Sequence, residues 1–162
     1  MEGALEEHAR RVLERYREAG ARLCLVEACT GGLIAASLTD IPGSSAVVEL
    51  GIVPYSNEAK AELLGVDPAL FQAHGAVSAE VARAMAEGAL SRSRAQVALA
   101  ETGIAGPGGG TATKPVGLVF LAVARRGAAT VVERHVFPGD RRAVRHAAAL
   151  RALALLREVL VP

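Results

Sequence analysis

Short apolar runs alternate with segments of helical periodicity along this chain, and that alternation restricts its fold more than any other feature. Helices are predicted where apolar residues recur every three or four positions, or where a capping residue opens such a segment. They cover residues 4–19, 30–38, 56–64, 78–92 and 140–159, with a further short helix starting at Asp67-Pro68. Apolar runs bounded by turn residues predict strands over residues 22–28, 46–55, 96–101, 118–124 and 129–137.

This order of elements predicts an α/β fold in which helices cover a central sheet. The last two strands flank Arg126-Gly127, a hairpin turn, so the sheet should be mixed rather than purely parallel. Residues 102–117 include six Gly and two Pro and are predicted to be irregular. With 162 residues, 51% of them hydrophobic, the chain suffices for one domain with a substantial core. We therefore expect a single three-layer α/β/α domain over residues 1–162.

Charge and hydropathy exclude several classes of function. The formal net charge of +1 argues against a dedicated nucleic-acid-binding protein, which usually carries a basic surplus. No run of 18 apolar residues occurs and the N-terminal residues do not resemble a signal peptide, so we expect no membrane partner and a cytoplasmic location. Cys24 and Cys29 have no second pair of cysteines nearby, so neither a disulfide framework nor a metal site is indicated.

Lysine is rare in this sequence. Sixteen of the 18 basic residues are Arg, and the two lysines are Lys60 and Lys114. Lysine differs from arginine chiefly in that a buried amine can lose its proton and act as a base. The two lysines are therefore either present by chance or stand at positions where arginine cannot replace lysine.

Three unusual segments follow predicted strands: residues 27–32, 55–60 and 102–110. In open α/β sheets, ligands bind outside the carboxyl ends of the strands. Glycines at such ends let backbone N–H groups approach an anion or a developing oxyanion. Each segment alone is more often a simple turn, and neither glycine-rich segment matches the dinucleotide fingerprint or the phosphate loop. Only their combination indicates a ligand site.

Six colinear motifs resemble those of the CinA C-terminal domain family, whose enzymes deamidate nicotinamide mononucleotide. In chain order they are Glu27-Ala28-Cys29-Thr30-Gly31-Gly32, Tyr55-Ser56-Asn57-Glu58-Ala59-Lys60, His74-Gly75-Ala76-Val77-Ser78, the loop from Thr102 to Gly110, Lys114-Pro115-Val116-Gly117 and Phe137-Pro138-Gly139-Asp140-Arg141. The resemblance covers nearly the whole chain, and six motifs in the same order make it specific.

This resemblance implies a CinA C-terminal-domain-like fold and hydrolysis of the carboxamide of nicotinamide mononucleotide to nicotinic acid mononucleotide and ammonia. It implies that a serine attacks the amide, that Lys60 accepts the proton of that serine, and that the Tyr55 hydroxyl assists. The substrate-binding residues that it implies are Cys29, Thr30, Gly31 and Gly32, then Thr102, Gly103, Ala105 and Gly106, and finally Arg141 for the phosphate. The backbone N–H groups of Cys29, Thr30 and Gly31 are candidate oxyanion donors.

The same resemblance implies no metal and no cofactor, and it makes a pyridine nucleotide the small-molecule partner. The oligomeric state stays open, with a homodimer among the alternatives.

The chain departs from the family motif at Ala28, which stands where the family has its nucleophilic serine. A methyl group cannot attack a carbonyl, so three interpretations compete. The protein has lost or changed its chemistry, or alanine was introduced to trap substrate, or a neighbour (Cys29 or Thr30) serves as nucleophile. A further departure is Glu101, a carboxylate where a small or apolar residue is expected. It could repel a phosphate or provide a new base.

Overall fold

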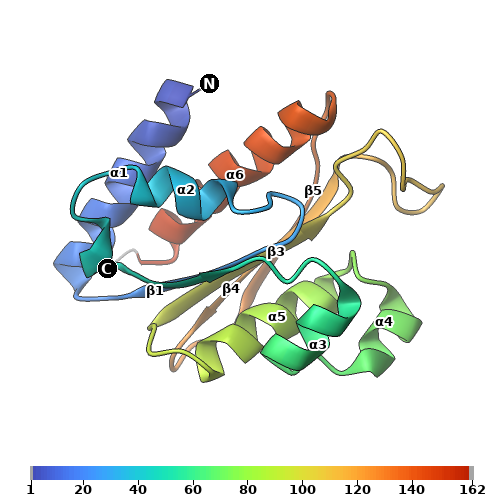
Figure 1. Cartoon of the computed structure of the whole chain (residues 1–162), viewed down its shortest axis with the longest axis horizontal. Coiled ribbons are helices and arrows are strands. Elements are labelled where there is room, and N and C mark those ends of the chain that lie inside the picture. The colour runs from blue at the N-terminus through green and yellow to red at the C-terminus, as the bar shows by residue number, and fades with distance from the viewer. Residues whose placement is uncertain (1, 161–162) are drawn as a thin grey trace.

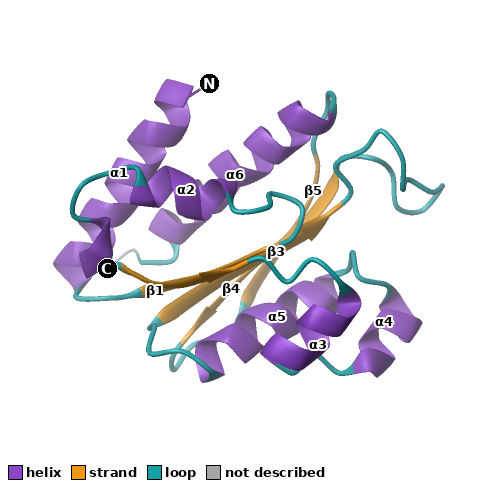
Figure 2. Ribbon diagram, viewed as in Figure 1, coloured by secondary structure: helices purple, strands orange, loops and turns teal. Residues whose placement is uncertain are grey.

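The computed structural model describes residues 2–160, in which helices pack on both faces of a five-stranded sheet (Figures 1 and 2). The α-helices are α1 (Glu2–Ala19), α2 (Leu33–Thr39), α3 (Asn57–Leu64), α4 (Pro68–His74), α5 (Ala79–Ser91) and α6 (Arg141–Glu158), and η1 (Ser44–Ala46) is a short 3-10 helix. The strands are β1 (Leu23–Glu27), β2 (Val48–Ile52), β3 (Val97–Gly103), β4 (Leu118–Arg125) and β5 (Val131–Val136). Within these residues no helix combines the length and apolar composition needed to cross a membrane.

The strand order is β2-β1-β3-β4-β5. Strand β1 runs parallel to both β2 and β3, whereas β4 is antiparallel to β3 and β5. The predicted mixed sheet is therefore confirmed. Because only β4 is reversed, the carboxyl ends of β1, β2, β3 and β5 all lie at the same edge of the sheet.

Two hydrophobic cores make the fold three-layered. Strand residues alternate between the two faces of a sheet: Leu23 and Leu25 enter the core beneath α1, α2 and α6, while Cys24 and Val26 enter the core beneath α5. Helices α3 and α4 pack against α5 on that second side. The α/β/α architecture expected from the sequence is confirmed.

Four helices begin where capping residues predict them. The side chains of Ser56, Asp67, Ser78 and Asp140 each accept a hydrogen bond from a backbone N–H in the first turn of α3, α4, α5 and α6. Such caps satisfy N–H groups that have no partner within the helix.

Several predicted boundaries are wrong. Strand β3 continues through Thr102 and Gly103, which were expected to be irregular, because both pair with β4. A Cβ at Gly103 would lie 2.9 Å from the Leu118 carbonyl oxygen, so glycine permits this close pairing. Helix α2 begins at Leu33 rather than Thr30, since the Thr30–Gly32 segment forms a turn held by other elements. Strand β2 covers only residues 48–52 of the predicted 46–55.

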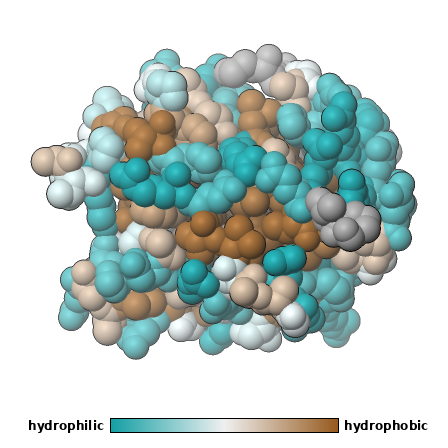
Figure 3. All heavy atoms as spheres, turned by 180° about the vertical axis from the view of Figure 1, so that it is seen from behind, coloured by the Kyte–Doolittle hydropathy of each residue, from teal (hydrophilic) through white to brown (hydrophobic). Residues whose placement is uncertain are grey.

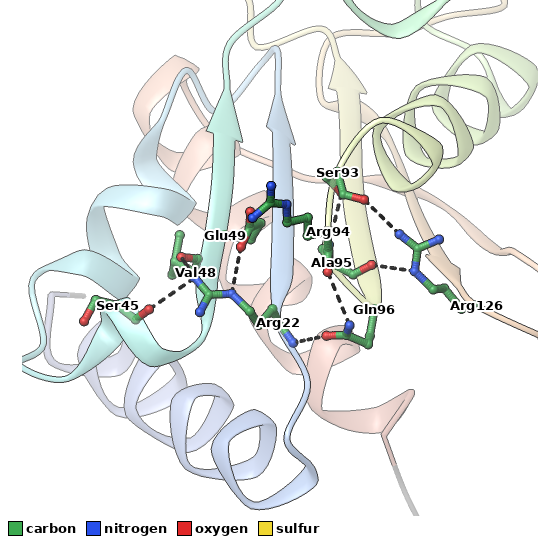
Figure 4. Close-up of polar contacts among 9 residues, drawn as sticks. All are labelled: Arg22, Ser45, Val48, Glu49, Ser93, Arg94, Ala95, Gln96 and Arg126. Atoms are coloured by element: carbon green, nitrogen blue, oxygen red, sulfur yellow. Dashed lines mark hydrogen bonds and ion pairs between the residues drawn. The ribbon is translucent and has the colours of Figure 1, made fainter.

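The amino edge of the sheet, opposite the carboxyl ends of β1 and β3, is held by arginine contacts (Figure 4). Arg22 pairs with Glu49 at 2.8 Å, and the backbone N–H of Arg22 donates to Gln96 at 2.6 Å. Arg126 donates to the carbonyl oxygen of Ala95 at 2.8 Å. These arginines connect strand ends and loops, so they are structural residues at the edge of the sheet opposite the carboxyl ends of β1 and β3.

Both outer strands of the sheet, β2 and β5, pair on one side only within residues 2–160. The five large hydrophobic side chains exposed on the described surface lie on or beside these strands and α3: Leu50, Val53, Tyr55, Leu63 and Val136. From behind, apolar side chains gather across the middle of the molecule (Figure 3). An unpaired strand edge offers backbone donors and acceptors to another chain.

Gly88 of α5 packs closely against Leu64 at the end of α3. A Cβ at this position would lie 2.0 Å from the Leu64 carbonyl oxygen. Gly88→Ala would gain about 1 kcal/mol of helix propensity, but forcing α5 from α3 costs about 1–3 kcal/mol. We expect net destabilisation, measured by urea unfolding. Gly3→Ala in α1 is the control, because a Cβ there meets no atom within 4 Å. A more stable Gly88→Ala variant would contradict the packing.

Candidate functional site

The predicted motifs meet at the carboxyl edge of the sheet. The segment after β1 (residues 28–32), the segment after β2 that leads into α3, the loop between β3 and β4, and the start of α6 after β5 all leave the sheet on this side. This is the place where open α/β sheets bind ligands. The topology therefore brings together residues that are more than 100 positions apart in the chain.

The Ala28–Gly32 turn is held from two sides. Oε1 of Glu101 accepts hydrogen bonds from the backbone N–H of Ala28 at 2.6 Å and of Thr30 at 2.8 Å. Arg145 of α6 donates to the carbonyl oxygens of Cys29 at 3.1 Å and Thr30 at 2.9 Å. Gly31 and Gly32 complete the turn with φ values of 61° and 104°, which favour glycine. Glu101 is thus part of the framework of the turn.

The side chain of Glu27 caps the N-terminus of α2, because the residue at the N-cap position cannot do so. The N-cap of α2 is Gly32, which has no side chain to accept a bond. Glu27 instead accepts from the backbone N–H groups of Ile34 at 2.8 Å and Ala35 at 2.9 Å. The family motif therefore includes an acidic residue that stabilises the helix leaving the site.

The turn retains unpaired backbone donors. Among residues 2–160 no acceptor lies within hydrogen-bonding distance of the N–H groups of Cys29, Gly31 or Gly32. Of the three predicted oxyanion donors, Cys29 and Gly31 are therefore available, whereas the Thr30 N–H is occupied by Glu101.

Lys60 lies at the same edge of the sheet as the turn that contains Ala28. Ala28 follows directly on the carboxyl end of β1, and Lys60 comes from the first turn of α3, which follows the carboxyl end of β2. Lys60 is only 3% exposed, and its Nζ donates to the Tyr55 carbonyl oxygen at 3.1 Å. Burial lowers the pKa of the lysine, although the charges of Glu101 and Glu58 oppose this effect. The pKa is thereby shifted in the direction that a general base requires.

Tyr55 contributes its backbone rather than its hydroxyl. The residue is 66% exposed, and no described residue contacts its hydroxyl by a hydrogen bond. The assisting role expected from the motif has no geometric support in the isolated chain.

Neither neighbour of Ala28 is arranged as a nucleophile. Burial and the charge of Glu101 raise the pKa of the Cys29 thiol to about 12, so the reactive thiolate is disfavoured. Thr30 is fully buried, and its hydroxyl contacts the carboxyl groups of Glu27 and Glu101. The geometry gives no support to replacement of the missing serine by either residue.

A cleft of about 700 Å³ lies between the β3–β4 loop and α6. Its lining residues are Leu33, Ala105, Pro107, Val116, Asp140, Arg141, Arg142, Arg145 and His146. None of the three arginines has a carboxylate partner within 4 Å among the described residues. Arg141 donates to the Gly106 carbonyl oxygen at 2.7 Å, which connects α6 to the loop. Unpaired guanidinium groups at a helix N-terminus form a favourable site for an anion such as phosphate.

The cleft contains some of the predicted binding residues and not others. Ala105 and Arg141 line it, and Gly106 borders it through its carbonyl oxygen. Thr102 instead lies buried in β3, where its hydroxyl donates to the Ala76 carbonyl oxygen at 2.9 Å. Gly103 is likewise part of β3. Sequence reasoning missed Arg145, although its position one helical turn after Arg141 places both on one face.

Lys114 makes a structural contact, so no catalytic role is needed to explain its presence. Its Nζ donates to the carbonyl oxygen of His74 at the end of α4, so it connects the glycine-rich loop to α4. Within residues 2–160, no group of three or more His, Cys, Asp and Glu side chains is arranged to hold a metal ion.

Residues 5–160 match the family model of the CinA C-terminal domain. A CinA-like protein of Anaeromyxobacter sp. is 52% identical over 154 residues, which are 95% of this chain and 37% of that protein. A CinA-like protein of Geobacter sulfurreducens is 53% identical over 150 residues, which are 93% of this chain and 36% of that protein. The chain thus spans little more than a third of the length of these relatives.

Solved structures agree in fold. The competence/damage inducible protein CihA from Agrobacterium tumefaciens superimposes with a TM-score of 0.93 at 47% identity, covering 97% of this chain and 95% of that one. A competence-damaged protein (CinA) superfamily protein from Klebsiella pneumoniae has a TM-score of 0.92 at 36% identity, covering 96% of this chain and 97% of that one.

Proposed function

The chain belongs to the CinA C-terminal domain family, and we propose that it binds nicotinamide mononucleotide in an amidohydrolase site that keeps its lysine and two backbone donors but lacks its nucleophile. The observation that carries this proposal is the buried Lys60 at the carboxyl edge of the sheet, the edge at which the Ala28–Gly32 turn keeps backbone donors without acceptors. A lysine with a lowered pKa and free N–H groups are what a serine–lysine amidohydrolase needs around its serine.

The roles of these residues follow from the chemistry of amide hydrolysis. With a serine at position 28, neutral Lys60 would accept the hydroxyl proton while the serine oxygen attacks the carboxamide carbon. The N–H groups of Cys29 and Gly31 would stabilise the resulting oxyanion. Lys60 would then return the proton to the departing nitrogen, so that ammonia leaves and an ester remains. Attack by water on that ester would release nicotinic acid mononucleotide.

The arginine-lined cleft supports a phosphate-bearing substrate. Arg141, Arg142 and Arg145 provide guanidinium groups near the start of α6, and the apolar lining residues Leu33 and Val116 suit a flat ring or ribose. Each charge-assisted hydrogen bond to a phosphate is worth about 1.5–3 kcal/mol. In this proposal the cleft provides the affinity for the phosphate-bearing substrate, whereas the residues around Ala28 and Lys60 provide the groups for amide hydrolysis.

A second candidate is a binding protein without catalysis, and Ala28 is the observation that favours it. Neither Cys29 nor Thr30 is placed to take over the attack, so the chain as it stands should hold substrate and turn it over slowly if at all. Both candidate functions predict the same ligand. They differ in whether a serine at position 28 would restore ammonia release.

Binding without rapid turnover is the direct test. We expect calorimetry to detect nicotinamide mononucleotide binding, and Arg141→Ala to weaken it by about tenfold or more, the equivalent of one charge-assisted bond. Arg134→Ala, on the exposed side of β5, is the matched control. Nicotinamide riboside, which lacks the phosphate, should bind both variants equally weakly. Absence of any heat or thermal shift at millimolar mononucleotide would count against the proposed ligand.

A further inference from the structure

A second cleft adjoins the arginine-lined cleft on the same face of the sheet. It has a volume of about 560 Å³ and lies between α1, α2 and α6, the three helices that pack together on that face (Figure 1). The two clefts share Leu33, Arg142 and His146 in their linings, so they meet beside the first turns of α6. Each is as large as a typical small-molecule site. A ligand bound in the first cleft can therefore extend into the second.

His146 is a buried polar side chain at this junction, and only 8% of it is exposed. Its Nδ1 atom is enclosed and has no hydrogen-bond partner among residues 2–160, whereas Nε2 is not enclosed in this way. A neutral imidazole has one nitrogen with a hydrogen and one with a lone pair. Because a buried N–H without a partner is rarer than a buried acceptor without one, the hydrogen belongs on Nε2. The ring therefore offers an N–H donor where the two clefts meet.

The groups around this donor are positively charged. Arg142 lies one helical turn before His146, so both side chains are on one face of α6. Arg141 and Arg145 line the first cleft beside them. No carboxylate of the described chain lies within 4 Å of these four side chains. Guanidinium and imidazole donors of this kind suit phosphate oxygens, so the junction can hold a second phosphate beyond the one that the proposed function places in the first cleft.

The residues that line only the second cleft have a different character. Leu5 and Ala36 are apolar, and Glu6 and Asp40 are acidic. Glu6 pairs with Arg10 at 2.9 Å, whereas the Asp40 carboxylate has no basic partner within 4 Å among residues 2–160. A carboxylate repels a further phosphate but accepts hydrogen bonds from ribose hydroxyls, as acidic residues do in dinucleotide-binding folds. The second cleft therefore suits a nucleoside whose ribose hydroxyls carry no phosphate.

We propose that the two clefts form one elongated site for a pyridine dinucleotide, in which Nε2 of His146 donates to the pyrophosphate and the second cleft receives the second nucleoside. The proposal rests on the proposed function for the phosphate cleft, and it extends the ligand from a mononucleotide to a pyrophosphate-linked dinucleotide. It assigns binding roles to His146 and Asp40, which lie outside the six family motifs.

The test is calorimetry of the unaltered chain with nicotinamide mononucleotide, NAD and NADP. We expect NAD to bind about tenfold or more tighter than the mononucleotide, because His146 and Asp40 each add a hydrogen bond that involves a charged group. NADP carries a further phosphate on the ribose that faces Asp40, so it should bind about tenfold or more weakly than NAD. NAD that binds no tighter than the mononucleotide would overturn the proposal.

Ala36→Trp tests the second cleft alone. Ala36 is exposed on α2 and lines this cleft, so a large side chain can fill it without entering the core. We expect the variant to lose its preference for NAD and to bind the mononucleotide as before. Ala73→Trp is the matched control, because Ala73 is exposed on α4, an equally short helix on the other face of the sheet. Equal NAD affinity in the two variants would contradict the proposal.

Two substitutions at position 146 test the imidazole donor. Glutamine can present an amide N–H in place of the Nε2 donor, whereas leucine has no donor. We expect His146→Leu to weaken NAD binding about tenfold or more, and His146→Gln to keep most of it. Equal loss in both variants would show that His146 acts through packing and would overturn its role. Should His146→Leu fail to fold, as thermal unfolding would reveal, Ala36→Trp still decides.

Ammonia release distinguishes this proposal from the proposed function. If Ala28→Ser releases ammonia from the mononucleotide but NAD binds no tighter than the mononucleotide, the dinucleotide site fails and the function stands. If NAD binds tighter and Ala36→Trp removes that preference, while Ala28→Ser releases no ammonia, the amidohydrolase function fails and the dinucleotide site stands.

Discussion

Ala28→Ser is expected to raise the rate of ammonia release from nicotinamide mononucleotide by at least about a thousand-fold. Loss of the nucleophile in a catalytic triad lowers the rate about a million-fold, and the oxyanion donors and substrate binding preserve a residual acceleration. The free N–H groups of Cys29 and Gly31 and the buried Lys60 are retained in this chain, so a serine would enter a prepared site.

The measurement is steady-state ammonia release, compared between the unaltered chain and the variant. Ala21→Ser is the matched control, because Ala21 is as buried as Ala28 but precedes the amino end of β1, whereas Ala28 follows its carboxyl end. If Ala28→Ser binds the mononucleotide and releases ammonia no faster than the unaltered chain, the site has diverged beyond its nucleophile and the binding-protein alternative is preferred.

Lys60→Arg, made in the Ala28→Ser chain, is expected to remove about a hundred- to ten-thousand-fold of the restored rate, which is the usual contribution of a general base. Arginine keeps the positive charge but does not lose its proton in proteins, so it cannot accept the serine proton. Lys114→Arg is the matched control, since Lys114 only connects the glycine-rich loop to His74. Equal loss in both variants would show that the lysines act through structure alone.

The activity of the Ala28→Ser chain is expected to increase with pH. Only the neutral amine of Lys60 can act as a base, so kcat/KM of the Ala28→Ser chain should rise with pH as the lysine loses its proton. Because burial lowers the pKa of Lys60, the midpoint of that rise should lie below the ordinary lysine value. Lys60→Arg should abolish this rise, whereas Lys114→Arg should leave it in place.

The sequence alone was sufficient for the layers of the fold and for several of the residues that meet at the carboxyl edge of the sheet. Periodicity and caps are local signals, so the helices beginning at Ser56, Ser78 and Asp140 could be read without a structure. The scarcity of lysine drew attention to Lys60 and Lys114 alike, and the structure shows that the Lys60 side chain is buried. Motif order was enough to indicate the family, because six short matches in sequence require no knowledge of contacts.

The tertiary structure decided how those residues meet. Glu101 holds the Ala28–Thr30 turn across a separation of more than 70 residues, and Arg145 does so across more than 110. These contacts depend on the order of β1 and β3 and on the position of α6, which no local pattern encodes. The same is true of Thr102, whose inclusion in β3 depends on its pairing with Phe120. Local propensity determines which elements form, whereas contacts between distant segments depend on strand order and on the packing of both layers, so only the folded chain could reveal that Glu101 belongs to the turn.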